Sequence, residues 1–341
     1  MLALQALTPD RLAAAVPEVT LAEARKLVAQ VHRGEPIAAS GSIRRTAADA
    51  VRAATQVPAI EVVSEQASQL DPFVKYALAS AGDTFEAVRI PLAHADRFSV
   101  CVSSQVGCAL ACAFCATGRL GLQRNLAAWE IIEQVRIVKA RLPRGRVHGV
   151  VFQGMGEPLA NLDNVLAAIE VLSEPCALGI DARAITVCTA GLPSGIRRLA
   201  AEAPNVRLGI SISSAIAEHR KRVMPIADRH SLDDVLAAGA EHARTTGHAP
   251  MWAVTLLAGV NDSDADAHAL AARAQAFGDS TGKRPRISLL DYNAIGGADP
   301  FTRSTRMPAF RDVLGGAGLA THRRYSGGAD VAAACGQLAG R

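Results

Sequence analysis

Short apolar segments alternate with longer segments rich in Ala and Leu along most of the chain after residue 84. Segments such as residues 126–142 and 162–172 have the composition and length of helices. Chains in which strands and helices alternate form parallel β-α units, so we expect an α/β fold. The strand candidates are residues 98–104, 148–156, 184–191, 206–213, 250–259 and 285–293. Six strands fit a partial (β/α)6 barrel better than a closed barrel of eight strands.

Residues 1–72 differ from the rest of the chain in composition, because the first aromatic residue is Phe73. Three helices are predicted in this part, at residues 7–16, 20–32 and 46–57, and each has a threonine near its start as an N-cap, namely Thr8, Thr20 and Thr46. We therefore expect an N-terminal helical module (1–72), a connecting β segment (73–100), the barrel (101–300) and a C-terminal extension (301–341).

Charge and hydropathy restrict the class of protein. Half of the 341 residues are apolar and 20% are charged, which is ordinary for a globular protein. The formal charge of +4 permits an RNA partner without demanding one. The sequence contains no apolar run long enough for a membrane helix, and its start lacks the pattern of a secretory signal. We therefore expect a cytoplasmic protein that does not contact a membrane.

Three of the seven cysteines, Cys108, Cys112 and Cys115, lie within eight residues of one another. They follow the first strand candidate, and in β-α barrels the loops after the strands form the active site. Thiolates bind iron-sulfur clusters and zinc, and three cysteines leave one iron of a four-iron cluster open to an outside molecule. We therefore predict a [4Fe-4S] cluster at this loop. A structural zinc site with Cys101 as its fourth ligand is the alternative.

The spacing CxxxCxxC, with Phe114 before the last cysteine, is typical of the radical-SAM superfamily. Three blocks resemble the RlmN/Cfr family of adenine-methylating RNA methyltransferases and occur in family order: CVSSQVGCALACAFCATGRLGLQRNL (101–126), VVFQGMGEPLANLDNVLAAI (150–169) and AAACGQLAG (332–340). The resemblance implies a radical-SAM barrel with a [4Fe-4S] cluster and S-adenosylmethionine. It also implies methylation of an adenine ring carbon, at position 2 or less readily 8, in rRNA or tRNA.

The same resemblance implies residues that contact S-adenosylmethionine. Gly156 and Glu157 match the positions that hold the amino group of the cofactor, and further contacts fall on Cys188, on Ser211, Ile212 and Ser213, and on Asn293. The chain departs from the family at two of these positions, because Cys188 stands where serine is usual and Ser213 where histidine is usual. A thiol is a weaker hydrogen-bonding group than a hydroxyl.

Three further residues match the chemistry of the family. Cys335 corresponds to the cysteine that carries the methyl group, and Cys101 to the cysteine that releases the product through a transient disulfide with Cys335. Glu86 corresponds to the proposed proton acceptor. An external electron donor such as flavodoxin or ferredoxin is implied as well.

Residues 1–72 lack the aromatic and basic character that this module has in the family. Two alternatives therefore remain open. One is a radical-SAM methylase of a small molecule or peptide, and the other is a non-catalytic RNA-binding protein with a structural metal site.

Overall fold

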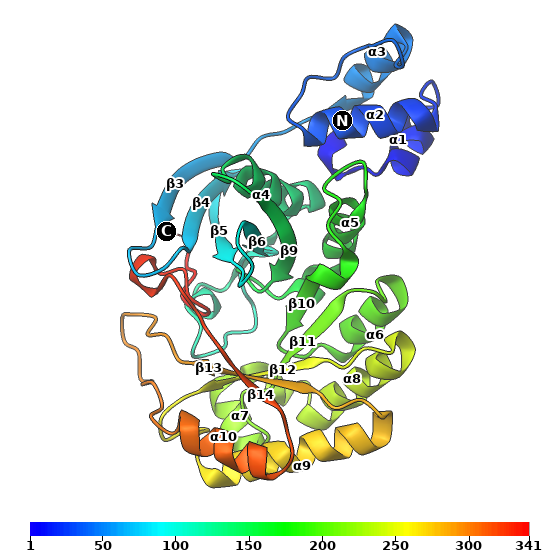
Figure 1. The fold of residues 1–341 in the computed structure, drawn as a ribbon. Helices are drawn as coiled ribbons and strands as arrows, with labels where there is room; N and C mark the ends of the chain where they lie inside the picture. Colours follow the sequence, from blue (N-terminus) through cyan, green and yellow to red (C-terminus); the bar gives the residue numbers. More distant parts are fainter. Residues whose placement is uncertain (341) are drawn as a thin grey trace.

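The computed structural model describes residues 1–340 and has at its centre a row of parallel strands that curve into a partial barrel (Figure 1). In spatial order these strands are β6 (Arg97–Val102), β9 (Arg146–Phe152), β10 (Ile185–Thr189), β11 (Arg207–Ser211), β12 (Met251–Leu256), β13 (Arg286–Asp291) and β14 (Thr321–Arg324). The six predicted strands and the α/β class are confirmed. The sequence Thr-His-Arg-Arg of β14 carries no apolar signal, because this strand lies at the edge of the sheet.

Helices connect the parallel strands and cover the outer face of the barrel (Figure 1). The short α7 (Ala217–Val223) instead lies at the carboxyl ends of the strands, where its last residue accepts a hydrogen bond of 2.9 Å from the N–H of Ala113 in the cysteine loop. The covering helices are α4 (Ala128–Ala140), α5 (Leu162–Ser173), α6 (Pro193–Glu202), α8 (Leu232–Thr246), α9 (Asp264–Thr281) and α10 (Met307–Gly316). Their apolar side chains and those of the strands form one hydrophobic core, in which Trp252 packs edge-on against Phe277 with 5.3 Å between the ring centroids.

An antiparallel extension continues the sheet beyond β6. Its strands are β5 (Asp83–Pro91), β4 (Val74–Ser80) and β3 (Glu61–Ala67), and Cys101 of β6 pairs with Val88 of β5. β3 lies within the part of the chain that we expected to be helical. Its side chains are mostly exposed because it is the other edge strand, so its sequence has little apolar character. The division of the chain into domains near residue 72 stays a prediction.

Residues 2–56 form a small helical unit with its own core. It contains β1 (Leu2–Ala3), the 3-10 turn η1 (Leu4–Ala6), α1 (Pro9–Ala15), α2 (Leu21–His32), α3 (Arg45–Ala54) and β2 (Thr55–Gln56). Thr8 and Thr20 are the N-caps of α1 and α2, as predicted. The third expected cap, Thr46, lies inside α3 instead, because that helix begins at Arg45 and has no side-chain cap.

The helical unit packs on the outer side of α4 and α5. The guanidinium of Arg136 in α4 donates a hydrogen bond of 2.6 Å to the carbonyl oxygen of Val31, and Arg11 pairs with Glu170 in α5. None of the helices within residues 1–340 has the length and apolar character needed to cross a membrane.

The remaining elements are short. A two-stranded hairpin of β7 (Gln105–Gly107) and β8 (Leu122–Asn125) encloses the cysteine loop. The other 3-10 turns are η2 (Thr117–Arg119), η3 (Pro158–Asn161), η4 (Ala182–Ala184), η5 (Pro225–Asp228) and η6 (Ala329–Val331).

Candidate active site

A cavity of about 150 Å³ opens at the carboxyl ends of the parallel strands. Thr189, Ser211 and Thr255, at or next to the ends of β10, β11 and β12, form one of its walls. The loop after β7 forms the opposite wall. This is the end of a β-α barrel at which active sites are built, because the loops that follow the strands converge there.

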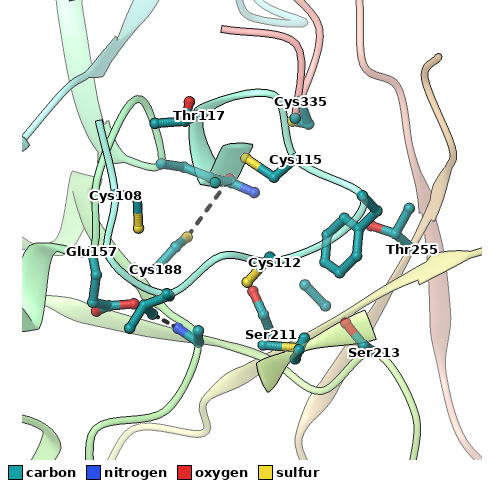
Figure 2. Close-up of a pocket in the computed structure, with 18 of the residues that line it drawn as sticks. Cys108, Cys112, Cys115, Thr117, Glu157, Cys188, Ser211, Ser213, Thr255 and Cys335 are labelled. Carbon is teal, nitrogen blue, oxygen red and sulfur yellow. Dashed lines mark hydrogen bonds between the residues drawn. The ribbon is translucent and has the colours of Figure 1, made fainter. Parts of the chain in front are cut away.

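All three cysteines of the motif, Cys108, Cys112 and Cys115, line this cavity, and Figure 2 shows them along one loop. The loop begins at the β7–β8 hairpin, where Gly107 has a φ of +74° and a Cβ atom would lie 1.8 Å from the carbonyl oxygen of Gly121. Only glycine fits there. The backbone N–H of Cys108 donates to the same oxygen at 2.9 Å, so the hairpin fixes the start of the loop.

Burial keeps the three motif thiols from ionising by themselves. It raises the pKa of Cys108 to about 11 and also raises the pKa values of Cys112 and Cys115. A positively charged metal centre would reverse this, because metal binding favours the thiolate. The set therefore fits a group that brings its own positive charge.

The number of motif cysteines, which is three, favours a cluster over a single zinc ion. Within residues 1–340, no three His, Cys, Asp or Glu side chains converge as ligands of one metal ion. A zinc site requires four donors within about 2.3 Å of one point. A cubane has irons at separate corners and takes thiolates that lie around it. The three motif cysteines fit a [4Fe-4S] cluster better than zinc.

Glu157 is the buried acid of this cavity. One carboxylate oxygen accepts a hydrogen bond of 3.0 Å from the N–H of Leu159, and the other accepts one of 2.8 Å from the N–H of Ala190. Burial nevertheless raises the pKa of Glu157 to about 7, because these neutral donors only partly replace water. A ligand cation would stabilise its charged form.

The glycines of the GMGEP motif are required by packing within the protein. Gly156 has a φ of +98°, and a Cβ atom there would lie 2.5 Å from the side chain of Gln105. A Cβ atom on Gly154 would lie 2.6 Å from the carbonyl oxygen of Val102. Both glycines also line the cavity, so the turn brings their backbone to the ligand space while it packs against the loop after β6.

The residues expected after β10 and β11 are divided between the cavity and the core. Cys188, Ser211 and Ser213 line the cavity, and the thiol of Cys188 donates a hydrogen bond of 3.7 Å to the Gln153 side chain (Figure 2). The side chain of Ile212 is buried in the hydrophobic core.

Arg220 is a further residue of this site, and in the sequence it stands in a run of three basic residues, Arg220, Lys221 and Arg222. It is 1% exposed and donates to the carbonyl oxygens of Ser211, Ile212 and Ala190. It therefore holds together the loops after β10 and β11. A longer helix would have placed Arg220 on its apolar face and so indicated burial. With only seven residues, α7 shows no apolar face in the sequence.

Cys335 reaches the cavity from the C-terminal segment, close to Cys115 in Figure 2. Its N–H donates to Ser326 Oγ at 2.7 Å, and its carbonyl oxygen accepts from Asn293 Nδ2 at 3.2 Å. The next residue, Gly336, accepts a hydrogen bond of 2.7 Å from the N–H of Ala116 in the cysteine loop. Asn293 thus contacts the segment that carries Cys335, and its expected contact with the cofactor stays a prediction.

A second cavity, of about 90 Å³, lies between Cys335 and Cys101 and is also lined by Arg324 and Gln153. Both cysteines are free thiols in this structure. Burial, with a contribution from Cys335, raises the pKa of Cys101 to about 12, and the guanidinium of Arg324 opposes the shift. Arg324 lies outside the three motif blocks, so the resemblance gave no sign of it.

Glu86 is buried on β5, where it pairs with Lys75 at 3.0 Å. One of its oxygens accepts from the N–H groups of Ala339 and Gly340, at 2.7 and 3.0 Å. These contacts place the carboxylate of Glu86 beside the last residues of the C-terminal segment, Ala339 and Gly340. Its expected role as a proton acceptor stays a prediction.

The radical SAM superfamily model matches residues 102–271. The chain is 40% identical to "Probable dual-specificity RNA methyltransferase RlmN" of Gloeobacter violaceus, over 81% of this chain and 77% of that protein. It is 56% identical to "Probable RNA methyltransferase" of Sorangium cellulosum, over 97% of this chain and 90% of that protein. The chain belongs to the RlmN/Cfr family of radical-SAM RNA methyltransferases.

A crystal structure described as a radical SAM methyltransferase from Sphaerobacter thermophilus is similar over the whole of both chains, with a TM-score of 0.88 and 32% identity. The RlmN/Cfr family and its radical-SAM partial barrel are thus confirmed. Membership in a radical-SAM family implies a [4Fe-4S] cluster and S-adenosylmethionine in general terms.

Proposed function

We propose that this chain methylates a ring carbon of adenine, at position 2 or less readily 8, in rRNA or tRNA, through a methyl group carried by Cys335. The observation that carries the proposal is the position of Cys335 between two cavities. It lines the first with the three motif cysteines and the second with Cys101. A methyl carrier needs both neighbours, since it must meet the cofactor and later a second thiol.

In this proposal Cys108, Cys112 and Cys115 hold the cluster, and Gly156 and Glu157 receive the amino group of S-adenosylmethionine. When bound, the cluster supplies the electron that cleaves the cofactor into methionine and a 5′-deoxyadenosyl radical. The buried Glu157 carboxylate would pair with the cofactor's ammonium, an interaction that is strong where water is excluded.

Cys188, Ser211 and Ser213 supply polar groups along the far wall of the cavity, where the rest of the cofactor would lie. Ile212 and Asn293 would support the site through hydrogen bonds. The carbonyl oxygen of Ile212 accepts from Arg220, and the side-chain amide of Asn293 donates to the carbonyl oxygen of Cys335.

The two further thiols have separate roles. Cys335 would hold a methyl group, taken from a first molecule of S-adenosylmethionine, as a thioether. One hydrogen of this methyl group would pass to the 5′-deoxyadenosyl radical, giving 5′-deoxyadenosine, and the resulting carbon radical would add to the adenine ring carbon. That ring carbon would then lose its proton to the proton acceptor and one electron to the oxidised electron carrier, which leaves a closed-shell adduct with Cys335. The Cys101 thiolate then attacks Cys335 Sγ, so that an S–S bond forms and the S–C bond breaks. The electron pair of that bond moves to the carbon, which takes a proton and leaves as the methyl group of the product. An external dithiol returns both cysteines to thiols.

Glu86 is proposed as the proton acceptor on the basis of the resemblance. Its contacts with Ala339 and Gly340 would couple it to the segment that carries Cys335. The partners in this proposal are the RNA substrate and an electron donor such as flavodoxin or ferredoxin, and the location is the cytoplasm.

The test begins with anaerobically purified protein. About four irons with sulfide per chain are expected, whereas one zinc would support a metal-stapled binding protein. The protein is then incubated with S-adenosylmethionine, reductant and RNA from cells that lack the gene, and the nucleosides are analysed by mass. A methyladenosine with a ring-carbon methyl group supports the proposal. Cleavage of the cofactor without any RNA methylation would favour a small-molecule or peptide substrate.

A further inference from the structure

Two arginines share one carboxylate at the carboxyl end of β13. The guanidinium groups of Arg303 and Arg323 each lie 2.7 Å from the same oxygen of Asp291. The side chain of Asp291 is 18% exposed, whereas those of Arg303 and Arg323 are 57% and 51% exposed. One negative charge therefore orients two positive charges, and a net positive charge faces solvent.

Open depressions flank this arginine pair on both sides. One, of about 540 Å³, is also lined by Arg311, whose Nε donates a hydrogen bond of 3.3 Å to Thr321 Oγ1. The other, of about 440 Å³, is lined by Arg324 and Tyr325 as well as by the pair. We call the two depressions together the arginine groove. Its surface offers several guanidinium groups and one carboxylate, so it suits an anionic chain.

The arginine groove continues into the proposed active site. Asn293 and Ser326 line it and also bond to the backbone of Cys335, at 3.2 and 2.7 Å. Arg324 lines both the groove and the cavity between Cys335 and Cys101. A chain bound in the groove would therefore lie beside the cysteine proposed to carry the methyl group.

Tyr325 adds an aromatic surface at the same place. Tyr325 is 68% exposed, and its hydroxyl donates a hydrogen bond of 2.7 Å to the carboxylate of Asp71. The ring also meets Phe73 edge-on, with 6.1 Å between the centroids. An exposed ring that is held on two sides is a rigid platform on which a nucleic-acid base can stack.

We infer that the arginine groove binds the phosphate backbone of the substrate RNA next to the target nucleotide, with Arg303 and Arg323 as phosphate ligands. This inference rests on the proposed function and adds to it the path of the RNA. The planar guanidinium group matches the geometry of phosphate oxygens. Asp291 orients the guanidinium groups of Arg303 and Arg323 before the RNA binds. Phosphate contacts of this kind position a nucleic acid without reading its sequence.

An acidic electron donor would be the other macromolecule attracted by such a charge. The exposed ring of Tyr325 and the continuity of the groove with Cys335 favour RNA, because an electron donor needs neither a stacking surface nor access to the methyl carrier. The experiment below separates the two.

The test compares the parent chain with the double variant Arg303→Gln/Arg323→Gln. The matched control is Arg197→Gln/Arg273→Gln, which removes two similarly exposed arginines of α6 and α9, each paired with a carboxylate of α8. The probes are total tRNA and, separately, protein-free rRNA from cells that lack the gene. Affinity is measured at several salt concentrations, and cofactor cleavage is measured without RNA, with dithionite as reductant.

The groove variant is expected to bind RNA at least tenfold more weakly at moderate salt. Its slope of log affinity against log salt should fall by roughly 0.7 to 0.9 for each lost phosphate contact. Cluster content and dithionite-driven cleavage should equal those of the parent, which shows that the variant is folded. Compared with the glutamine variant, Arg303→Lys/Arg323→Lys should recover part of the salt slope, since lysine keeps the positive charge but lacks the planar guanidinium group.

Parent-like affinity and salt slope in the folded groove variant, or an equal loss in the control, would overturn the inference. So would normal RNA binding with cleavage that is impaired only when flavodoxin replaces dithionite, because the groove would then serve the electron donor. Failure of the proposed function has a different signature: the parent chain itself would methylate neither RNA.

Discussion

The Nζ atom of Lys75 lies 3.0 Å from the carboxylate of Glu86, and both side chains are buried. The same carboxylate accepts hydrogen bonds from the backbone of Ala339 and Gly340. This ion pair therefore ties β4 and β5 to the end of the segment that carries Cys335. The position of the proposed methyl carrier depends on a contact made some 250 residues earlier in the chain.

Lys75→Met is expected to destabilise the protein by about 3 to 5 kcal/mol, because it removes one partner of a buried ion pair. It should also lower methylation, since Glu86, which accepts hydrogen bonds from Ala339 and Gly340, loses the ammonium group that helps to position it. Thermal unfolding and single-turnover methylation measure the two effects. Lys26→Met, at an exposed position of α2, is the control. A variant as stable as the control would show that the pair contributes little.

Glu157→Gln should keep the cluster and weaken the binding of S-adenosylmethionine by roughly tenfold or more, the usual loss when a hydrogen bond to a charged group is removed. The substitution preserves the shape of the side chain and removes its charge. Equilibrium binding to the reconstituted protein is the measurement, with iron content as the check on the cluster. Glu170→Gln, on the exposed face of α5, should have parent-like affinity. If Glu157→Gln does too, the carboxylate serves only the turn.

Cys335→Ala and Cys101→Ala are expected to differ in kind. The first removes the methyl carrier, so neither methylated RNA nor a covalent complex should form. The second leaves the carrier and removes only the thiol that releases the product, so a protein-RNA adduct should accumulate. A denaturing gel with labelled RNA distinguishes them by a shifted band for Cys101→Ala alone. Repeated turnover by Cys101→Ala would remove this cysteine from the proposal.

Release of the product should be faster at higher pH. Burial raises the pKa of Cys101 to about 12, and only the thiolate attacks sulfur, so its population grows about tenfold per pH unit below that value. Decay of the adduct after rapid mixing should follow this dependence between pH 7 and about 9. Arg324→Gln removes the guanidinium that favours the thiolate and should slow the decay at each pH, whereas Arg324→Lys should restore part of it. A decay that does not change with pH would contradict the assignment.

His32 should make the stability of the protein sensitive to acid. Burial, together with the charges of Arg136 and Lys139, lowers its pKa to about 3, below the ordinary value of 6.5. The unfolded chain therefore binds a proton that the folded chain does not, and stability falls as the pH drops from about 6.5 towards 3. The slope is at most about 1.4 kcal/mol per pH unit.

His32→Leu should remove the contribution of His32 to the change of unfolding free energy with pH. The measurement is denaturant unfolding of parent and variant at pH 7, 6, 5 and 4, and the expected result is a difference that grows as the pH falls. His268→Leu, at an exposed position of α9, is the histidine control. Parallel curves for parent and His32→Leu would contradict the prediction.

Local patterns in the sequence determined the barrel and the cluster loop. Strands such as Ile185–Thr189 are buried in a parallel sheet, so their apolar residues are continuous and visible without a structure. The cysteines Cys108, Cys112 and Cys115 are close in the chain, and a loop of eight residues necessarily keeps them close in space. Edge strands such as β14 were not recognised, because one row of their backbone groups and most of their side chains meet solvent.

Only the tertiary structure decided which distant residues meet. Glu86 with Ala339 and Gly340, Arg324 with Cys101, and Asp291 with Arg323 are joined by the packing of segments remote in sequence. A charged residue in a sequence carries no sign of its burial, and only the fold shows that Arg220 and Lys75 are enclosed. Position along the chain determines chemistry within a loop, whereas contact between loops depends on how the sheet curves and brings its strand ends together.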